Sequence, residues 1–340
     1  NISGVMKMSS RNIIGGNFDL SYRKGKISFA NKFSLDYNKA ENPVVPFSEF
    51  SRANPYYRKT GANGKIERYL DHFDIPGTNT TYSVGNPLWN YSLNNLDEED
   101  QFSFRNNLNL EWRIMPSLYL RGRLGIGKGV KKTEQFISPQ HSRFDNYVQD
   151  QKGSYTISNS TTINFDANIR FMYNNVFADK YTVSAGIGSE LSTSDLTGEG
   201  FTAVGFLSDK LKNIQYAQQF KKDSKPTGSY DKTKMVGFFA NLNVGYDNRY
   251  FLDASFRTDG SSKFGRNSRF APFWSVGAAW NVDKESFWTG TGYMKIRASV
   301  GSTGTTNFTS DQALTQYLYQ SSSEYNGIYG AVLSAYGNPS

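Results

Sequence analysis

Apolar and polar residues alternate one by one along ten stretches of this chain. In the first stretch, Phe18, Leu20 and Tyr22 are separated and flanked by polar residues. A period of two residues indicates a β-strand whose two faces lie in different media. The alternation predicts ten strands, at residues 17–23, 27–37, 102–114, 118–126, 163–173, 181–191, 238–246, 250–257, 274–282 and 294–300. One or two further strands are expected within 1–16 and 314–335.

Short and long links follow one another between these stretches, which is typical of a transmembrane β-barrel. A strand of about eleven residues tilted by about 45° spans about 25 Å, the height of the apolar band of an outer-membrane barrel. A soluble β-sandwich also alternates, although its strands are usually shorter, at about 5–6 residues. The short links are Lys24-Gly25, 115–117, 175–180 and 247–249, and the long polar segments cover roughly 39–100, 130–160, 195–234 and 259–271.

Charged residues agree with this interpretation. Sixteen ionised residues fall within the predicted strands, all at polar positions of the alternation: Asp19, Arg23, Lys32, Asp36, Arg105, Glu111, Arg113, Arg121, Arg123, Asp166, Arg170, Glu190, Asp253, Arg257, Lys295 and Arg297. A charge facing lipid near the bilayer centre costs about 2–4 kcal/mol, which selects against the other positions. Five residues break the pattern: Asn31 and Asn106 at apolar positions, and Phe239, Phe251 and Phe273 at polar ones.

Aromatic residues at the strand ends predict the girdles that flank the apolar band of a barrel. These are Tyr22, Tyr37, Trp112, Tyr173, Tyr181, Tyr246, Tyr250 and Trp280.

Composition narrows the class of protein. The 340 residues are 37% hydrophobic, with a mean hydropathy of −0.58, and they contain no run of about 18 apolar residues, so a helical membrane protein is excluded. The absence of cysteine excludes disulfides and thiolate metal sites. The net charge of +8 is spread along strands and loops. With no basic run or nucleic-acid motif, nucleic-acid binding is not expected.

Candidate chemistry is sparse. The two histidines, His72 and His141, lie in predicted loops and are expected to be solvated. The run Asp97-Glu98-Glu99-Asp100 lacks the spacing of a Ca²⁺ loop and is expected to be a solvated acidic loop. No hydrolase or phosphate-binding motif is present. We therefore predict that the protein is not an enzyme and uses no cofactor and no metal.

The long segment 44–95 is the best candidate for ligand contact. Its aromatic rings lie beside amide and guanidinium donors, which suits flat sugar or peptide planes. The alternative is that these side chains pack the loop into the barrel mouth. The candidate substrate-contact residues are Arg52, Tyr56, Tyr57, Arg58, Trp89, Asn90 and Tyr91.

Several longer motifs resemble the barrel of SusC/RagA-type TonB-dependent transporters from the outer membranes of Bacteroidetes. One strand ends in Arg257-x-Asp259-Gly260-Ser261-Ser262-x-Phe264-Gly265, and the returning strand carries Pro272, Ser275, Gly277 and Trp280. Other matching motifs are Lys295-Ile296-Arg297-Ala298-Ser299-x-Gly301-x-Thr303-Gly304, Asn54-Pro55-Tyr56-Tyr57-Arg58 and Asn86-Pro87-Leu88-Trp89-Asn90-x-Ser92-Leu93. The resemblance covers most of the chain.

The resemblance implies a large plugged barrel in the outer membrane that imports glycans or peptides, is energised by TonB and works with a SusD-like surface lipoprotein. Outer-membrane transporters of that size close with about twenty-two strands. The sequence shows no plug domain, no TonB-contacting segment and no barrel-closing C-terminus. Residues 1–340 are therefore expected to form about half of a barrel, because open sheet edges facing lipid are costly.

The sequence thus predicts an outer-membrane nutrient transporter. A passive porin or an adhesin on a similar barrel is the alternative, and a barrel hydrolase would need a nucleophile–base pair. Segment 259–270 should be a loop beyond the bilayer, carrying the family motif Asp259, Gly260, Ser261, Ser262, Phe264 and Gly265, together with Lys263 and Arg266. Residues expected to face the lumen or a plug are Arg105, Arg113, Arg121, Arg123, Asp166 and Arg170.

Overall fold

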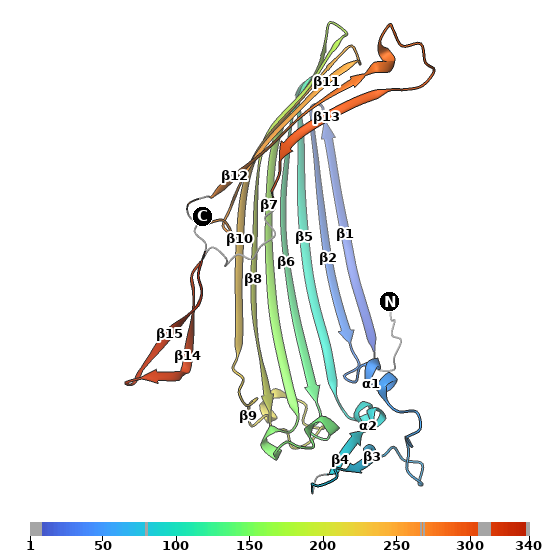
Figure 1. Cartoon of the computed structure of the whole chain (residues 1–340), viewed down its shortest axis with the longest axis vertical. Helices are drawn as coiled ribbons and strands as arrows, with labels where there is room; N and C mark the ends of the chain where they lie inside the picture. The colour runs from blue at the N-terminus through green and yellow to red at the C-terminus, as the bar shows by residue number, and fades with distance from the viewer. Residues whose placement is uncertain (1–8, 79–80, 266, 268, 305–313, 338–340) are drawn as a thin grey trace.

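The ten predicted strands form one antiparallel sheet in a computed structural model, which describes residues 9–78, 81–265, 267, 269–304 and 314–337 (Figure 1). Each long strand pairs with its neighbours in chain order. The strands of the sheet are β1 (Ser10–Lys24), β2 (Ile27–Glu41), β5 (Leu96–Met115), β6 (Leu118–Ile137), β7 (Ser154–Phe177), β8 (Tyr181–Val204), β10 (Thr227–Tyr246), β11 (Tyr250–Ser261), β12 (Phe270–Asn281) and β13 (Lys295–Ser302).

Smaller elements lie in the links between the long strands. The segment between β2 and β5 folds into α1 (Phe47–Arg52), β3 (Tyr69–Asp74), β4 (Thr81–Gly85) and α2 (Pro87–Ser92). Short 3₁₀ turns, η1 (Ser142–Phe144), η2 (Gln149–Gln151), η3 (Ile214–Tyr216) and η4 (Val282–Lys284), lie in other links, and β9 (Gln219–Phe220) pairs with the end of β8. The further strands expected within 314–335 are confirmed as β14 (Gln316–Tyr325) and β15 (Ile328–Ala335), which pair only with each other.

The sheet is a single layer, and its apolar residues are not packed into an interior. Leu110, Phe165 and Leu242 are 38%, 36% and 39% exposed. The largest buried apolar cluster among the described residues is small, formed by Phe136, Tyr155 and Phe206. A sandwich would bury these strand residues between two sheets, so the soluble β-sandwich is wrong and a partial barrel is confirmed. No helix among the described residues is long and apolar enough to cross a membrane.

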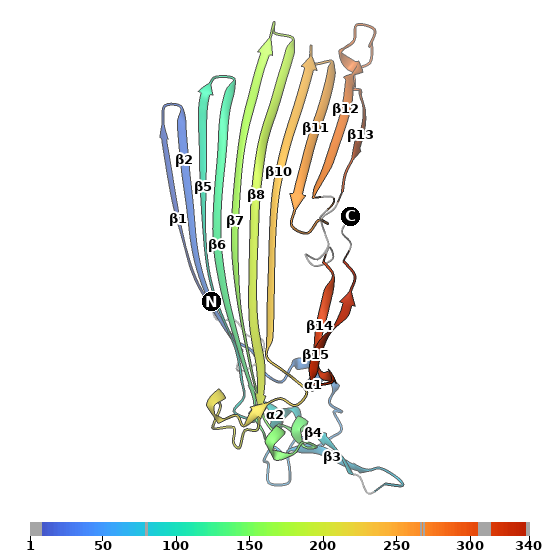
Figure 2. The same ribbon diagram turned by 90° about the vertical axis from the view of Figure 1, so that its left-hand side faces the viewer.

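The short turns between β1 and β2, β5 and β6, β7 and β8, and β10 and β11 lie at one end of the sheet, as predicted, and most long segments lie at the other (Figure 2). We call these the turn end and the loop end. The β12–β13 link, residues 282–294, is longer and lies at the same end as the short turns. The first turn is Gly25-Lys26, one residue later than predicted, because Gly25 takes a positive φ of 56° that the tight turn requires. At the loop end the strands are longer than predicted: β7 and β8 have 24 residues each.

These additional lengths form a loop-end extension, comprising residues 96–101 of β5, 131–137 of β6, 154–162 of β7, 195–204 of β8 and 227–234 of β10. The expectation that these residues are loops is wrong. Asp97–Asp100, expected to be an acidic loop, belongs to β5 and pairs with β2 and β6. Ion pairs bridge the strands there: Lys39 and Glu98 at 3.5 Å, Lys131 and Glu99 at 2.9 Å, and Lys232 and Asp195 at 2.8 Å.

The ten predicted stretches of these strands, here called the band, keep the predicted alternation. Because cross-strand partners share a face, the ladder register places all sixteen charged residues on one face, the charged face. The opposite, apolar face ends toward the turns in an aromatic row of Tyr181, Tyr246, Tyr250 and Trp280, with ring centroids 4.8–6.4 Å apart. The row contains four of the eight residues predicted for the girdles.

Candidate functional site

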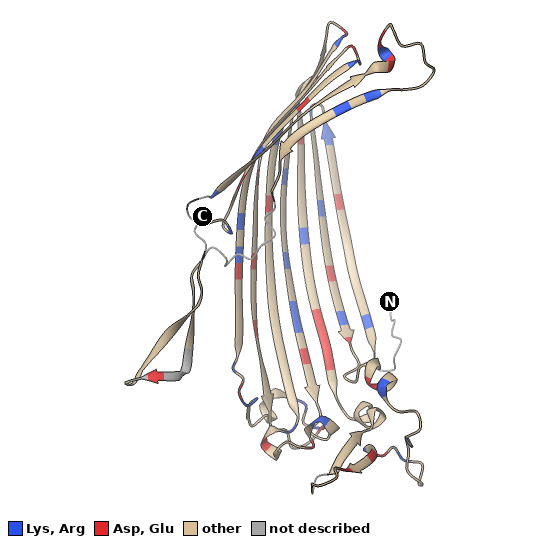
Figure 3. Cartoon of the chain, in the orientation of Figure 1, with Lys and Arg blue, Asp and Glu red and all other residues tan. Residues whose placement is uncertain are grey.

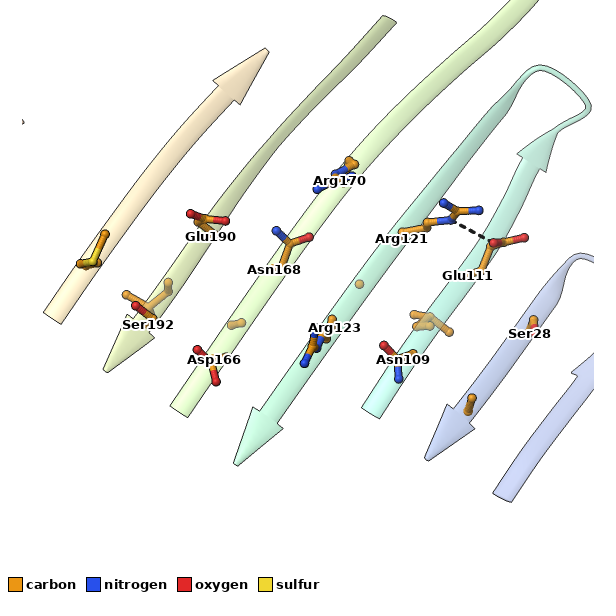
Figure 4. A pocket seen from close by; sticks show the side chains of 16 residues that line it. Ser28, Asn109, Glu111, Arg121, Arg123, Asp166, Asn168, Arg170, Glu190 and Ser192 are labelled. Atoms are coloured by element: carbon orange, nitrogen blue, oxygen red, sulfur yellow. Dashed lines mark hydrogen bonds and ion pairs between the residues drawn. The ribbon is translucent and has the colours of Figure 1, made fainter. Parts of the chain in front are cut away.

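The charged face of the band is hollowed where five strands meet. A hollow of about 800 Å³ lies over β2, β5, β6, β7 and β8, with Met235 of β10 at its margin, and Figure 4 shows its polar side chains projecting from the first five of these strands. Its predicted lumen-facing residues are Arg121, Arg123, Asp166 and Arg170. Arg105 lines an adjacent hollow of about 570 Å³, together with Arg123 and Asp166. The structure therefore brings these five predicted residues together on one face.

Ion pairs hold part of this surface in place. Glu111 accepts hydrogen bonds from Arg121 at 3.0 Å and from Arg113 at 3.3 Å, so Arg113, the sixth predicted residue, joins the same group. Arg123 donates to the side-chain oxygen of Asn107 at 3.3 Å. Charged residues of both signs follow the strands along their length (Figure 3). Ten of the sixteen charges on the charged face are positive and six are negative, so it can hold polar or mixed-charge groups.

The family motif residues Arg257 and Asp259 form a second ion cluster on this face. The Arg257 guanidinium pairs with Glu190 and also with Asp259, at 2.7 Å. Gly237 lies between them, and a Cβ there would be 2.7 Å from the Asp259 carboxylate. Asp259 is buried. A glycine on β10 therefore lets three charged side chains from β8 and β11 meet.

The rest of this motif ends a strand instead of forming an open loop. Asp259, Gly260 and Ser261, predicted as loop residues, are the last residues of β11. Ser262 closes the ladder: its N–H donates to the Lys234 carbonyl at 2.9 Å, and its hydroxyl accepts from the Lys234 N–H at 2.9 Å. The N–H of Phe264 donates to the Ser261 carbonyl at 3.1 Å. Gly265 follows in the loop and is buried. Arg266 lies outside the described residues.

The five exceptions to the alternation have structural explanations. Asn106 donates to the side-chain oxygen of Asn31 at 2.9 Å, so the two amides on the apolar face partly satisfy each other. Phe239 lies under the Arg170 guanidinium, 5.1 Å from ring centroid to Cζ, and Phe251 lies under the Lys295 ammonium at 4.5 Å. These rings support cations on the charged face. Phe273 covers the backbone of Gly304.

The segment between β2 and β5 is fastened to the β6–β7 link by buried polar groups. Asn90 is 3% exposed; its amide nitrogen donates to the Ser142 hydroxyl at 2.9 Å, and its oxygen accepts from the Ser142 N–H at 3.0 Å. Asn86 caps α2 by accepting from the Leu88 N–H at 3.0 Å. Arg68 forms an ion pair with Asp145. We call these residues the loop cluster.

The predicted ligand-contact residues are divided by this packing. Tyr56 is 93% exposed, and Arg52 and Arg58 are also exposed. Tyr57, Trp89 and Tyr91 are half-buried, against Phe73, the Gln140 carbonyl and Phe50 respectively. Asn90 points into the loop cluster and has both ends of its amide occupied, so its polar groups hold the loop in this structure.

The two histidines differ. His72 is exposed and hydrogen-bonded to the Ser83 hydroxyl at 2.9 Å, as predicted for a solvated residue. His141 is only 5% exposed, so the prediction that it is solvated is wrong. Burial, followed by the nearby Arg143 and Arg68 cations, lowers the pKa of His141 to about 4. Among the described residues, no group of three or more His, Cys, Asp or Glu side chains could hold a metal ion.

The sequence matches no protein-family model. It is 24% identical over 340 residues to the TonB-dependent receptor P39 of Formosa agariphila, covering 99% of this chain and 31% of that receptor. It is 26% identical over 322 residues to the TonB-dependent receptor SusC of Bacteroides thetaiotaomicron, covering 91% of this chain and 30% of SusC. The chain thus spans about a third of the length of these curated relatives.

Solved structures agree on the fold. The structure of the RagAB peptide transporter aligns with a TM-score of 0.76 at 17% identity, covering 97% of this chain and 37% of that one. The RagAB peptide importer in the open-open state aligns equally well, with a TM-score of 0.76 at 19% identity. As in these relatives, the strands of this chain belong to an antiparallel β-barrel of the outer membrane. Over nearly its whole length, then, the chain is similar to a part of the SusC/RagA-type TonB-dependent receptors of Bacteroidetes, as its sequence predicts.

Proposed function

We propose that this chain forms part of an outer-membrane transporter that imports a nutrient through its barrel, driven by TonB. The observation that carries the proposal is the division of the band into a charged face with all sixteen charges of the predicted strands and an apolar face that bears the aromatic row. A wall between lipid and a polar interior needs this division, and the apolar face is left uncovered by other parts of the described chain. The part of the proposal that concerns TonB is supported by the relatives that are named TonB-dependent receptors.

In this proposal the charged face lines the lumen, and Arg105, Arg113, Arg121, Arg123, Asp166 and Arg170 contact a plug or the passing ligand. Buried charges need partners. The ion pairs of Glu111 and Arg257 already provide partners for some charges of the charged face. The remaining polar groups in the hollow of about 800 Å³ suit a plug surface of mixed charge.

The loop end would lie outside the cell, where it receives the ligand and a SusD-like lipoprotein. Tyr56, with its ring almost fully exposed, and Tyr57 and Trp89 beside the loop cluster offer stacking surfaces for a glycan or a peptide. The loop cluster supports this role because its buried amides hold the loop in one conformation before the ligand arrives.

Uptake of the ligand tests the energised step. Cells that express the receptor should accumulate the ligand only when TonB is present, and the purified receptor should be nearly silent in a planar bilayer. The passive porin predicts the opposite: steady ion conductance, and uptake that survives deletion of TonB. Open-channel conductance of the intact receptor would therefore reject our proposal.

Ligand contact is tested separately. The triple variant Tyr56→Ala/Tyr57→Ala/Trp89→Ala should weaken ligand binding, measured by calorimetry, by about tenfold or more, because aromatic side chains often dominate binding energy. Tyr82→Ala, an exposed tyrosine of β4 in the same segment, is the matched control. Unchanged affinity in the triple variant would leave these residues with a packing role only.

A further inference from the structure

Another hollow lies at the loop end of the charged face, beyond the band. Its volume is about 560 Å³, within the range of small-molecule sites. The floor is the loop-end extension of β6, β7 and β8, and the walls come from the links after β6 and after β8. We call it the loop-end hollow. Its lining includes Gln135, Ser154, Thr156 and Thr202 from the floor, and Arg143, Phe144, Tyr147, Gln151, Lys221, Lys222 and Asp223 from the walls.

Positive charge dominates the walls of this hollow. Arg143, Lys221 and Lys222 oppose a single carboxylate, Asp223. Among the described residues, none of the three cations forms an ion pair. This differs from the neighbouring extension, where Lys131, Lys132 and Lys232 each pair with a carboxylate. Three cations gathered in one hollow without counter-charges favour an anionic ligand.

The main chain fixes the positions of these cations. The Lys221 N–H donates to the Thr202 carbonyl at 3.0 Å, which prolongs the pairing of β8 with β9. The Lys222 N–H donates to the Gln151 side chain at 3.3 Å, which ties the two walls together. The lysine side chains therefore start from an ordered rim, and less conformational entropy is lost when a ligand binds.

An aromatic ring and uncharged polar groups complete the hollow. Tyr147 is 50% exposed, and its ring packs edge-on against the buried Phe144 at 5.7 Å. On the floor, the Thr156 and Thr202 hydroxyls are hydrogen-bonded to each other at 3.0 Å. A half-exposed tyrosine face beside hydroxyl and amide groups suits the apolar face and the hydroxyls of a sugar ring.

The floor offers no backbone edge to a peptide. The β6–β7 ladder continues to Ile137 and Ser154, the β7–β8 ladder to Ser154 and Val204, and β9 covers the last residues of β8. Extended peptides gain much of their affinity by adding a strand to a free sheet edge. Recognition in this hollow must instead use side chains, which favours an acidic sugar over an acidic peptide.

We propose that the loop-end hollow binds an anionic oligosaccharide, with a sugar carboxylate held by Arg143, Lys221 and Lys222 and a sugar ring against Tyr147. The inference rests on the proposed function and deepens it, because it names the class of ligand that the transporter receives at its loop end. No sequence pattern predicts this site, because Arg143 and the two lysines are far apart in the sequence and are brought together only by the fold.

The test is equilibrium binding to the purified, intact receptor, measured by calorimetry with tetragalacturonate and with its methyl ester, which has the same rings but no charge. The wild type should bind the acid at millimolar concentration or below, and more tightly than the ester. The double variant Lys221→Gln/Lys222→Gln should weaken binding of the acid by about tenfold and leave the ester unchanged. Added salt should weaken the wild type more than the variant.

The matched control is Lys210→Gln/Lys225→Gln, which removes the same charge from the same link outside the hollow and should change affinity less than about twofold. Equal affinity for acid and ester, unchanged affinity in the Lys221/Lys222 variant, no binding of the acid by the wild type, or tighter binding of tetraglutamate would each overturn the proposal. Binding by the purified receptor needs no TonB. A failure of this site therefore leaves the uptake result intact, and a failure of energised uptake leaves the binding result intact.

Discussion

Strand β7 passes through two environments, and its sequence changes where the environment changes. In the band, Ile163, Phe165 and Ile169 lie on the apolar face while Asp166 and Arg170 lie on the charged face. In the loop-end extension, residues 158–162 are serine, asparagine or threonine on both faces. The main-chain pairing with β6 and β8 is continuous across both parts. Alternation therefore records the surroundings of a strand, whereas the hydrogen-bonded ladder alone makes it a strand.

The two regions should also differ in what stabilises them. In the band, the apolar face depends on lipid, because its side chains have no protein covering them among the described residues. The loop end has a small core of its own, with Phe136, Tyr155 and Phe206, and a loop cluster held by buried amides. The band should lose stability when a charge is placed on its apolar face. The loop end should lose stability when a buried neutral group becomes charged.

A charge on the apolar face should produce the largest effect. Phe165→Arg should lower the free energy of unfolding by about 2–4 kcal/mol, because the guanidinium would face the bilayer core. Asn159→Arg is the matched control, on the same strand and the same face but in the loop-end extension, and should change it by less than about 0.5 kcal/mol. Urea titration of the receptor in lipid vesicles measures both. Equal losses in the two variants would show that the extension also lies in lipid.

Acid should weaken the loop cluster through His141. Because burial, with Arg143 and Arg68, lowers its folded pKa to about 4, the unfolded state binds the extra proton as pH falls below about 6.5. Stability therefore decreases from about pH 6.5 toward pH 4, by about 3 kcal/mol in total. Hydrogen-exchange protection of residues 138–145, corrected for the intrinsic pH dependence, should decrease over this interval.

The control for this prediction is His141→Asn, which retains an acceptor for the Arg143 N–H that now donates to the histidine ring at 3.1 Å. Asparagine does not titrate in this range, so the variant should lose the pH dependence of protection. If protection fell equally with pH in both proteins, groups other than His141 would control the acid response.

The sequence predicts the band well and the loop end poorly, for one physical reason. All ten strands are found because the two faces of the band require different residues. The ends of β5 to β8 are missed because much of the extension, such as residues 158–162 of β7, is polar on both faces. The period of two therefore disappears there while the ladder continues. One local signal could have identified α2: Asn86-Pro87 is a helix cap followed by proline at the first helical position.

The candidate site shows the same limit. The charged residues of the band were identified from their positions in the alternation, including the arginines of the central hollow. Asn90 is a predicted ligand contact because it lies beside Trp89 and Tyr91. Its hydrogen bond to Ser142, 52 residues away, is revealed by no local pattern. Similarly, Phe239 breaks the alternation for a reason that lies on another strand, the guanidinium of Arg170.

The ion cluster of the band should be worth more than an ion pair of the loop-end extension. Arg257→Gln would leave Glu190 and the buried Asp259 without their shared cation, and should cost about 2 kcal/mol. Arg297→Gln, on the same face but without an ion pair among the described residues, should cost less than about 0.5 kcal/mol. Unfolding in urea compares them. A cost for Arg257→Gln no larger than that of the control would mean that water fully screens the cluster.

The smallest effect is expected for an ion pair of the loop-end extension. Lys131 lies 2.9 Å from Glu99, yet its side chain is 45% exposed, so Lys131→Gln should cost less than about 1 kcal/mol, and high salt should remove most of that loss. The double variant Lys131→Gln/Glu99→Gln isolates the pairwise energy by a double-mutant cycle. A pairwise energy above about 2 kcal/mol would mean that charge pairs, and not the main-chain ladder, hold the extension together. In that case the lysines and glutamates themselves would make the strands continue past the band. The polar composition of the extension would then cause its structure and would not simply reflect its surroundings.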